Sequence, residues 1–244
     1  MARQPKLVLR ESCVGDMSAG WVPGSFIEMG AGTGYMARMF LERGFHGACH
    51  DLGDDSRRLI RANLAPYGGR ISVVDTIDEI PAAGFDYLFA FEVLEHIEDD
   101  RGTFGAWSEK LRPGGRVLVS VPAHQRKFGK SDEIVGHVRR YERDELEGLL
   151  LGAGYTDISI VNYGFPLTEA TRRFSNFLVR GDRSYDTLSP REKSIRSAQT
   201  RPAIVTRWIE LFGEGAVTPF REVQRWFYDR DWGDGLVASA IKLG

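Results

Sequence analysis

Short apolar segments alternate with amphipathic ones through the first half of the chain. Each apolar segment is bounded by glycine, proline or an acidic residue, which is typical of a buried strand. The predicted strands are 25–29, 47–51, 70–75, a fourth within 85–96, and 111–122. The range 85–96 includes the loop that follows the fourth strand. Helical spacing and helix-ending residues predict helices between the strands at 35–44, 55–68 and 99–111. Strands of this kind, alternating with helices, predict a parallel sheet covered by helices on both faces.

The second half begins with a polar, charged segment at 123–141, which is long for a connection between a strand and a helix. A predicted helix at 142–155 and a strand at 157–164 follow it. Helical patterning with many aromatic residues then extends over 165–233, and a strand closes the chain at 235–244. We predict a single domain over 1–244 in which 165–233 is a helical insertion before the last strand.

The first predicted strand runs into a glycine loop, EMGAGTG, from Glu28 to Gly34. Glycines between a strand and a helix let the backbone approach a ligand closely and offer amide groups at a helix N-terminus. The spacing departs from the G-x-G-x-x-G of dinucleotide-binding loops, because Tyr35 stands where the third glycine would be. No Lys-Ser/Thr pair follows, which excludes a nucleoside triphosphate loop. The Glu28 carboxylate would repel a pyrophosphate, but it suits a ligand with an ammonium group, such as S-adenosylmethionine.

Three further residues stand at the ends of successive predicted strands. Asp51 ends the second strand, where a carboxylate can accept hydrogen bonds from both ribose hydroxyls of a nucleoside. Asp75 ends the third, where it could lie by the adenine amino group, and Phe91 ends the fourth, where it offers an aromatic edge to the adenine. Asp51 alone does not discriminate between cofactors, since NAD enzymes use an acidic residue in the same way.

Composition and charge narrow the class of partner. The chain has 244 residues, of which 42% are hydrophobic and 27% charged, and a formal net charge of -2, which argues against nucleic-acid binding. Its two cysteines, Cys13 and Cys49, have no CxxC spacing, so we expect neither a disulfide framework nor a metal site. No stretch approaches the ~20 apolar residues that cross a bilayer, and the first residues lack the apolar run of a signal peptide. We expect a soluble, cytoplasmic protein.

Motifs at three places along the chain resemble one known family. EMGAGTG, DYLFAFEVLEHIED and LRPGGRVLVSVP, in this order, are similar to the motifs of class I S-adenosylmethionine-dependent methyltransferases, and most closely to the bacterial group similar to the ubiquinone-biosynthesis type. The resemblance covers 25–164 and the final strand. It implies an α/β fold, a Rossmann-like seven-stranded sheet whose last strand is antiparallel. It also implies S-adenosylmethionine as the cofactor and S-adenosylhomocysteine as its product.

The resemblance assigns a cofactor role to each motif. The glycine loop holds the methionine part, Asp51 the ribose, and the residues at 75–77 the adenine, while Phe91 and Glu92 line the pocket. The sequence after the second strand, DLGDDS, is longer than in relatives, which leaves the role of Leu52 beside the adenine open. The expected cofactor residues are Glu28, Gly30, Ala31, Gly32, Gly34, Asp51, Leu52, Asp75, Thr76, Ile77, Phe91 and Glu92.

Histidines are the candidates for acid–base chemistry. The sulfonium makes the methyl group electrophilic, so the main task of the protein is to align a nucleophile. A hydroxyl or a protonated amine must also lose a proton, which suits histidine at neutral pH. The candidates are His96 at the end of the fourth strand, His124 just after the fifth, and His137 in GHVRRY. A structural role is the alternative for each of them, and for His96 it is the favoured interpretation.

The segment GHVRRY and the predicted insertion are the candidates for the acceptor side. Similar segments recur in this bacterial group, so the resemblance implies that Arg139, Arg140 and Tyr141 shape the acceptor site. An arginine pair binds carboxylate or phosphate well, which would suit an anionic acceptor, and ordinary salt bridges are the alternative. The aromatic residues of the insertion favour a core of the insertion itself, with a substrate cage as the alternative. The resemblance implies that the insertion covers the acceptor pocket as a lid, with a homodimer interface or a membrane surface as the alternatives. The aromatic residues are Trp208, Phe212, Phe220, Trp226, Phe227 and Tyr228.

These features predict an enzyme, a methyltransferase that acts on an oxygen or nitrogen of a small molecule. Methylation of a lipid-linked or protein acceptor is one alternative. A protein that binds S-adenosylmethionine without transferring its methyl group, and whose insertion serves protein contacts, is another. A nicotinamide-dependent oxidoreductase is opposed by Glu28 and Tyr35.

Overall fold

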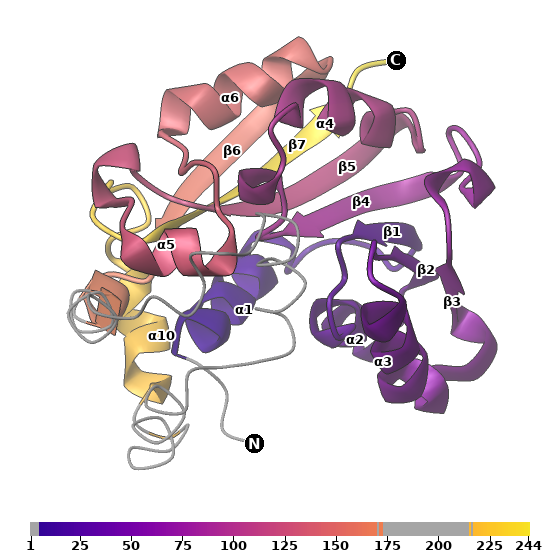
Figure 1. Ribbon diagram of the computed structural model, residues 1–244, viewed down its shortest axis with the longest axis horizontal. Helices are drawn as coiled ribbons and strands as arrows, with labels where there is room; N and C mark the ends of the chain where they lie inside the picture. The colour runs from indigo at the N-terminus through magenta and orange to yellow at the C-terminus, as the bar shows by residue number, and fades with distance from the viewer. Residues whose placement is uncertain (1–4, 170, 173–214, 216) are drawn as a thin grey trace. The chain divides into compact units, whose positions relative to one another are not determined.

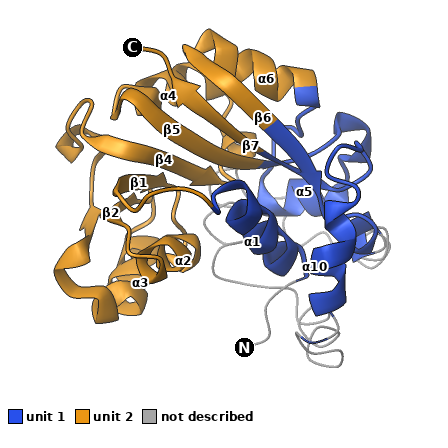
Figure 2. Ribbon diagram, turned by 180° about the vertical axis from the view of Figure 1, so that it is seen from behind, with its two compact units in different colours: residues 1–19, 121–143, 160–237 blue, residues 20–120, 144–159, 238–244 orange. Residues whose placement is uncertain are grey.

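The computed structural model describes residues 5–169, 171–172, 215 and 217–244 (Figure 1). These residues form two compact units, each assembled from several segments of the chain (Figure 2). The first unit comprises 1–19, 121–143 and 160–237, and the second comprises 20–120, 144–159 and 238–244. The predicted insertion at 165–233 belongs to the first unit. Its residues at 170, 173–214 and 216, which include Trp208 and Phe212, lie outside the described residues.

The strands form a seven-stranded sheet in the order β3-β2-β1-β4-β5-β7-β6. The strands β1 to β5 pair in parallel, and the last strand, β7, runs antiparallel to its neighbours β5 and β6 (Figure 1). The predicted Rossmann-like sheet is therefore confirmed. The strands are β1 (Ser25–Met29), β2 (His46–His50), β3 (Ile71–Val74), β4 (Phe85–Phe91), β5 (Leu111–Pro122), β6 (Tyr155–Tyr163) and β7 (Gly235–Lys242).

Helices of the second unit cover both faces of its strands, with α2 and α3 on one side and α4 and α6 on the other (Figure 1). The α-helices of the chain are α1 (Pro5–Met17), α2 (Tyr35–Glu42), α3 (Asp54–Leu64), α4 (Asp100–Ser108), α5 (Lys130–Val135), α6 (Arg143–Gly152) and α10 (Thr218–Arg225). Short 3-10 helices are η1 (Ala65–Arg70), η2 (Ile77–Glu79), η3 (Leu94–His96) and η4 (Gln125–Lys127). The four helices predicted with explicit bounds all exist, and each is shorter than its apolar pattern indicated.

Stacked phenylalanines form the core beneath the glycine loop. Phe89 of β4 is fully buried, and its ring lies 4.1 Å from that of Phe40 in α2 and 5.3 Å from that of Phe26 in β1. Such aromatic pairs contribute about 0.5–1.5 kcal/mol each beyond the burial of their area. The core thus joins the strand before the loop to the helix after it, which fixes both ends of the loop.

Helix α1, which the sequence pattern did not predict, packs against α10 in the first unit. It buries Val8, Leu9, Cys13 and Val14. Gln224 of α10, 1% exposed, donates a hydrogen bond to the carbonyl oxygen of Leu9 (3.0 Å) and accepts one from the amide of Gly164 (3.1 Å). A buried amide that uses both its donor and its acceptor fixes the place of α1 in this unit.

The polar segment at 123–141 is more buried than its composition predicts. It contains η4 and α5, and Lys127, Asp132 and Arg140 are each 9% exposed or less. Charged side chains are rarely buried in this way unless they are paired, and each of these makes an ion pair. Among the described residues, no helix has the length and the apolar composition needed to cross a membrane.

Candidate functional site

The glycine loop adopts a backbone that only glycine tolerates well. Gly30, Gly32 and Gly34 have φ angles of +66°, +58° and +75°, in the left-handed region that L-residues avoid. A Cβ atom on Gly30 would lie 2.6 Å from a methyl carbon of Val93, and one on Gly34 would lie 3.0 Å from Leu64. A Cβ atom on Gly32 would meet nothing within 4 Å. Gly32 therefore faces open space, where a ligand can approach the backbone.

Asp51, the residue after β2, holds the glycine loop from the side. Its Oδ2 accepts a hydrogen bond from the amide of Gly32 (2.8 Å), and its Oδ1 accepts one from the amide of Gly53 (3.1 Å). Arg57 donates to the Asp51 carbonyl oxygen at 2.6 Å. An ionised carboxylate can accept about four hydrogen bonds, so Asp51 keeps acceptor capacity beyond the two amides. A nucleoside ribose could use that capacity.

The other predicted cofactor residues of β1 and β4 flank this loop along the parallel strands. Glu28 is 2% exposed and lies in register with Cys49 of β2 and Phe89 of β4. Phe91, the last residue of β4, is 6% exposed. Glu92 follows it with φ of +57°, and its amide donates to the carbonyl oxygen of Ser120 in β5 at 2.8 Å. The loop and these residues belong to the same unit and lie at the neighbouring carboxyl ends of β1 and β4.

The predicted adenine residues lie near two arginines. Arg61 donates a hydrogen bond to Asp75 at 2.6 Å, and Arg57 lies 3.2 Å from the same carboxylate oxygen. The hydrogen bond from Arg61 is the main reason why the pKa of Asp75 lies below its ordinary value. Thr76 caps η2 through Glu79, with two hydrogen bonds of 2.9 Å. An adenine amino group would therefore share Asp75 with the arginines, and the adenine roles of Asp75, Thr76 and Ile77 stay predictions.

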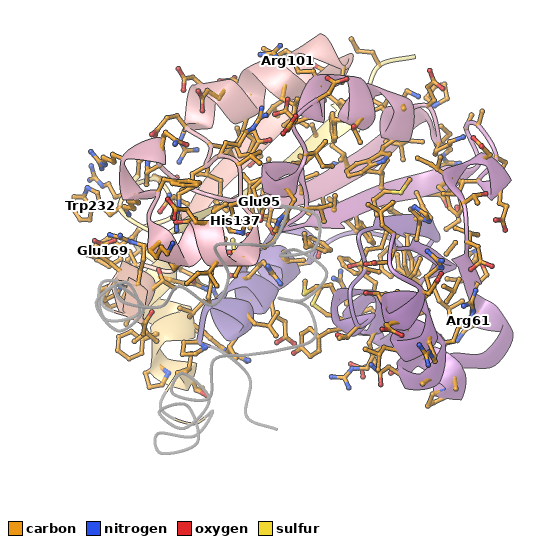
Figure 3. All side chains as sticks on the ribbon, viewed as in Figure 1. Arg61, Glu95, Arg101, His137, Glu169 and Trp232 are labelled. Carbon is orange, nitrogen blue, oxygen red and sulfur yellow. The ribbon has the colours of Figure 1, made fainter. Side chains whose placement is uncertain are left out.

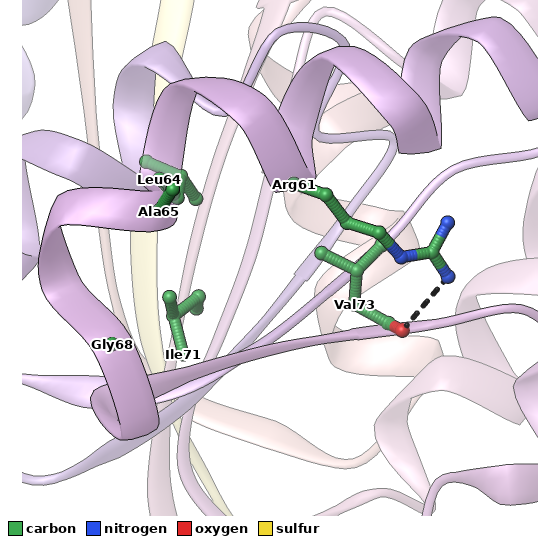
Figure 4. A pocket seen from close by; sticks show the side chains of 6 residues that line it. All are labelled: Arg61, Leu64, Ala65, Gly68, Ile71 and Val73. Atoms are coloured by element: carbon green, nitrogen blue, oxygen red, sulfur yellow. Dashed lines mark hydrogen bonds between the residues drawn. The ribbon is translucent and has the colours of Figure 1, made fainter.

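Leu52 is 68% exposed, directly after Asp51. An apolar side chain this exposed is available to cover a flat ring, which is consistent with the open prediction of an adenine contact. A hollow of ≈ 190 Å³ also lies by β3, lined by Arg61, Leu64, Ala65, Gly68, Ile71 and Val73 (Figure 4). It is smaller than the ~300–1,000 Å³ of typical ligand pockets, and none of its residues belongs to the glycine loop. We therefore do not assign it to the cofactor.

His124 is the most unusual of the three candidate histidines. It is 3% exposed, and its φ of +66° is rare for a residue with a side chain. Its Nδ1 lies 2.9 Å from Oε2 of Glu142. Its Nε2 is buried and has no hydrogen-bond partner among the residues that the structure describes. The sequence offered no signal for Glu142, because it is separated from His124 by 18 positions.

His137 and Arg140 converge on one carboxylate, that of Asp132 in α5. Oδ1 of Asp132 lies 2.9 Å from Nδ1 of His137 and accepts a 2.9 Å hydrogen bond from Nε of Arg140. Arg140 also donates to the carbonyl oxygen of Ala123 and to Asp234. Burial alone would raise the pKa of Asp132, but His137 and Arg140 hold it below its ordinary value. Arg140 is thus engaged within the protein, which favours the alternative interpretation of salt bridges for this residue.

The remaining residues of the GHVRRY segment, and His96, stay predictions as site residues. Tyr141 is 3% exposed, its amide donates to the carbonyl oxygen of Pro122, and its own carbonyl oxygen accepts from the amide of His124. Arg139 is half-buried. His96 ends η3 in the second unit, and its amide donates to the carbonyl oxygen of Val93.

An ionic network that sequence reasoning missed extends from Asp234 to Lys127. Arg172 pairs with Asp234 and with Glu169, and Glu169 pairs with Lys127 at 3.1 Å. Lys127 also donates to the carbonyl oxygens of Trp232 and Gly233. His137, Glu169 and Trp232 are marked in Figure 3. The residues of this network lie in three distant parts of the sequence, at 127, 169–172 and 232–234, so no local pattern could have indicated their contacts.

Comparisons with known proteins agree with this geometry. A family described as "Methyltransferase domain" matches residues 16–160, more than half of the chain. Ubiquinone biosynthesis O-methyltransferase of Idiomarina loihiensis is 28% identical over 99 residues, which cover 39% of this chain and 41% of that protein. The chain thus matches less than half the length of this relative.

Solved structures share the fold at low sequence identity. Phosphoethanolamine N-methyltransferase 2 of Haemonchus contortus, in complex with phosphomonomethylethanolamine and S-adenosylhomocysteine, has a TM-score of 0.62 at 18% identity, covering 96% of this chain and 52% of that one. The (4+2)-cyclase SpnF has a TM-score of 0.58 at 14% identity, covering 98% of this chain and 82% of that one. The chain belongs to the methyltransferase-domain family, which confirms the family that the motifs predicted.

Proposed function

We propose that this protein transfers the methyl group of S-adenosylmethionine to an oxygen or nitrogen of a small-molecule acceptor by in-line displacement. The observation that carries the proposal is the arrangement of Gly32 and Asp51. Gly32 exposes its backbone toward open space, and Asp51 holds the loop in that conformation while keeping unused acceptor capacity. A ligand with a nucleoside and an amino acid end, and no phosphate, fits a loop flanked by two acidic residues.

Different residues of the second unit would bind different parts of the cofactor. The amides and the open face of the glycine loop would hold the methionine part, with Glu28 supplying negative charge for its ammonium group. Asp51 would accept the ribose hydroxyls, and Leu52 and Phe91 would offer apolar surface to the adenine. When bound, the cofactor supplies an electrophilic methyl group, and the protein holds it in place for the acceptor.

The acceptor side of the proposal draws on relatives and on chemistry. The curated relative is named an O-methyltransferase, and the Haemonchus enzyme is named an N-methyltransferase and binds a small phosphorylated amine. Oxygen and nitrogen acceptors both require that a proton be removed before or during transfer. His96, His124 and His137 remain the candidates for that step, and Arg139 and Tyr141 remain candidates for acceptor binding.

The alternatives are tested by the same experiments. A lipid-linked or protein acceptor would use the same donor site. The fold also serves the cyclase SpnF, so the fold alone does not fix the reaction. Trp226 and Trp232 are 78% and 51% exposed. Because exposed aromatic side chains suit a contact surface, a homodimer interface or a membrane contact of the insertion stays a prediction.

Two measurements test the proposal. Isothermal titration calorimetry with S-adenosylmethionine, S-adenosylhomocysteine and NAD should give binding of the two sulfur nucleosides only. Mass spectrometry of a metabolite extract, incubated with the protein and a donor carrying a labelled methyl group, should then reveal a small molecule that gains the label. Absence of sulfur-nucleoside binding at millimolar concentration would refute the proposed donor. Label that enters only lipid or protein would replace the small-molecule acceptor by one of the alternatives.

A further inference from the structure

His124 and Glu142 form a hydrogen-bonded pair whose geometry points to a proton-accepting site. Both residues lie in the first unit, close to the end of β5. Open α/β sheets place their ligands outside the carboxyl ends of the strands. His124 stands two residues after Pro122, the last residue of β5, and so at that end of the strand.

Glu142 fixes which nitrogen of His124 carries the proton. One carboxylate oxygen, Oε2, lies 2.9 Å from Nδ1 of His124, and the other, Oε1, accepts the amide of Gln125 at 3.0 Å. Both carboxylate oxygens of Glu142 therefore have hydrogen-bond partners, which fixes the orientation of the carboxylate. Because an ionised carboxylate only accepts hydrogen bonds, the proton of a neutral His124 ring belongs on Nδ1. The lone pair then stands on Nε2.

Nε2 is the atom that this arrangement leaves available. It is buried, and none of the described residues hydrogen-bonds to it. A buried polar atom without a partner costs about 1–3 kcal/mol, and such an atom in a native structure calls for an explanation. A ligand that donates a proton to Nε2 supplies one.

The backbone of His124 is also strained in the conformation that presents the ring. Its φ and ψ angles are +66° and +102°, a region that costs on the order of 1–3 kcal/mol for a residue other than glycine. Two backbone hydrogen bonds hold it there: the amide of Ala123 donates to the Asp234 carbonyl oxygen, and that of His124 donates to the Tyr141 carbonyl oxygen at 2.9 Å. Strain of this kind tends to gather at functional sites.

We propose that Glu142 is the positioning residue for His124, and that Nε2 of His124 is the base that takes the proton of the methyl acceptor. This inference rests on the proposed methyl transfer. The proton of an acceptor hydroxyl or ammonium passes to Nε2. The electron pair left on the oxygen or nitrogen forms the bond to the methyl carbon, and the carbon–sulfur bond breaks with its electrons on sulfur. The carboxylate of Glu142 stabilises the imidazolium that forms. Between the histidine candidates, the structure thus favours His124.

The position of the ring proton tests the geometry without cofactor or acceptor. In ¹⁵N-labelled protein, NMR should show neutral His124 as the Nδ1–H tautomer, which is the minor form of free histidine. Glu142→Gln should shift it toward Nε2–H, since an amide that still accepts from Gln125 presents its NH2 group to Nδ1. Glu147→Gln, an exposed residue of α6, is the matched control and should leave the tautomer unchanged. An Nε2–H tautomer in the unaltered protein would overturn the inference.

Turnover on the acceptor found by mass spectrometry tests the role. His124→Asn should lower kcat by about 10²–10⁴-fold, as for loss of a general base, and Glu142→Gln by about 10–100-fold, as for loss of an orienting partner. Affinity for S-adenosylmethionine should be the same in both variants. Asparagine tolerates positive φ, so His124→Asn can fold, and Glu142→Gln gives a second, milder change. Unchanged kcat in both would overturn the inference while leaving methyl transfer intact. Failure of the unaltered protein to bind the donor would overturn the proposed function itself.

Discussion

Replacing Gly32 by alanine separates the conformational role of the glycine loop from its role in binding. The new Cβ atom would meet no protein atom within 4 Å, so the folded protein bears only the cost of the positive φ. That cost is roughly 1–2 kcal/mol, and the lower entropy of the unfolded alanine chain offsets about 0.4–1 kcal/mol of it. We expect a net loss near ~1 kcal/mol, which for a chain of this size lowers the Tm by about 2–4 °C.

The effect on cofactor affinity should be larger than the effect on stability. If the open face of Gly32 receives the methionine part of the cofactor, a methyl group there blocks the approach. We expect S-adenosylmethionine to bind at least about tenfold more weakly, equivalent to ~1.4 kcal/mol. Calorimetric titration of the folded variant measures this directly, with thermal unfolding on the same sample.

Gly154→Ala is the matched control for this experiment. Gly154 also has a positive φ, +81°, and a Cβ atom there would also meet nothing within 4 Å. It follows α6 and contributes nothing to the glycine loop, so the variant should lose similar stability and keep its affinity. If Gly32→Ala bound the cofactor as tightly as the unaltered protein does, the placement of the methionine part over this loop would be wrong.

Three further substitutions probe the donor site and the stability of the first unit. Asp51→Ala should weaken binding of S-adenosylmethionine at least about tenfold in calorimetry, since hydrogen bonds to a charged group contribute ~1.5–3 kcal/mol each; unchanged affinity would remove Asp51 from the ribose role. Gln224→Leu leaves the Gly164 amide and the Leu9 carbonyl oxygen buried without their present partner. Urea unfolding should therefore show that the free energy of unfolding falls by about 2–5 kcal/mol. A fall below ~1 kcal/mol would contradict the stabilising role of the Gln224 side chain. Burial raises the pKa of Glu169, but hydrogen bonds from its cationic partners outweigh it and lower the value from 4.5 to about 2; its ionised form therefore stabilises the protein above pH 4.5, and this contribution is lost as the pH falls toward 2. Glu169→Gln should flatten the acid part of the stability curve in that window, and an unchanged slope would show that the network does not depend on this charge.

The sequence predicted the parts of the fold that depend on local patterns. The strands of the parallel sheet are buried on both faces, so their residues form continuous apolar runs that stand out from the helices between them. Helix α1 gave no such signal. Polar residues interrupt its apolar ones, and its packing against α10 stabilises it through contacts with residues about two hundred positions away, such as Gln224 with Leu9.

The same difference separates the two halves of the candidate site. The donor loop is written in consecutive residues, because close approach of the backbone requires glycine at fixed positions. Asp51 could be anticipated, since it ends a strand. The partners of His124 and Arg140 could not, because Glu142 and Asp234 reach them only through the fold. Arg140 illustrates the consequence: two adjacent arginines suggested an anion site, and the structure shows the guanidinium of one of them already paired inside the protein.

The packing of α1 against α10, which are far apart in the sequence, also has a consequence for how the chain folds during synthesis. The strands and helices that carry the donor loop are continuous over residues 20–120 and can pair as soon as they leave the ribosome. Helix α1 is made first, but the surface that covers it is made almost last. Its apolar side chains must therefore stay uncovered while some two hundred residues are added at ~5–20 residues per second. For about ten seconds or more, the newest protein would present an apolar helix that chaperones can bind, and shortening the chain before α10 would make that exposure permanent.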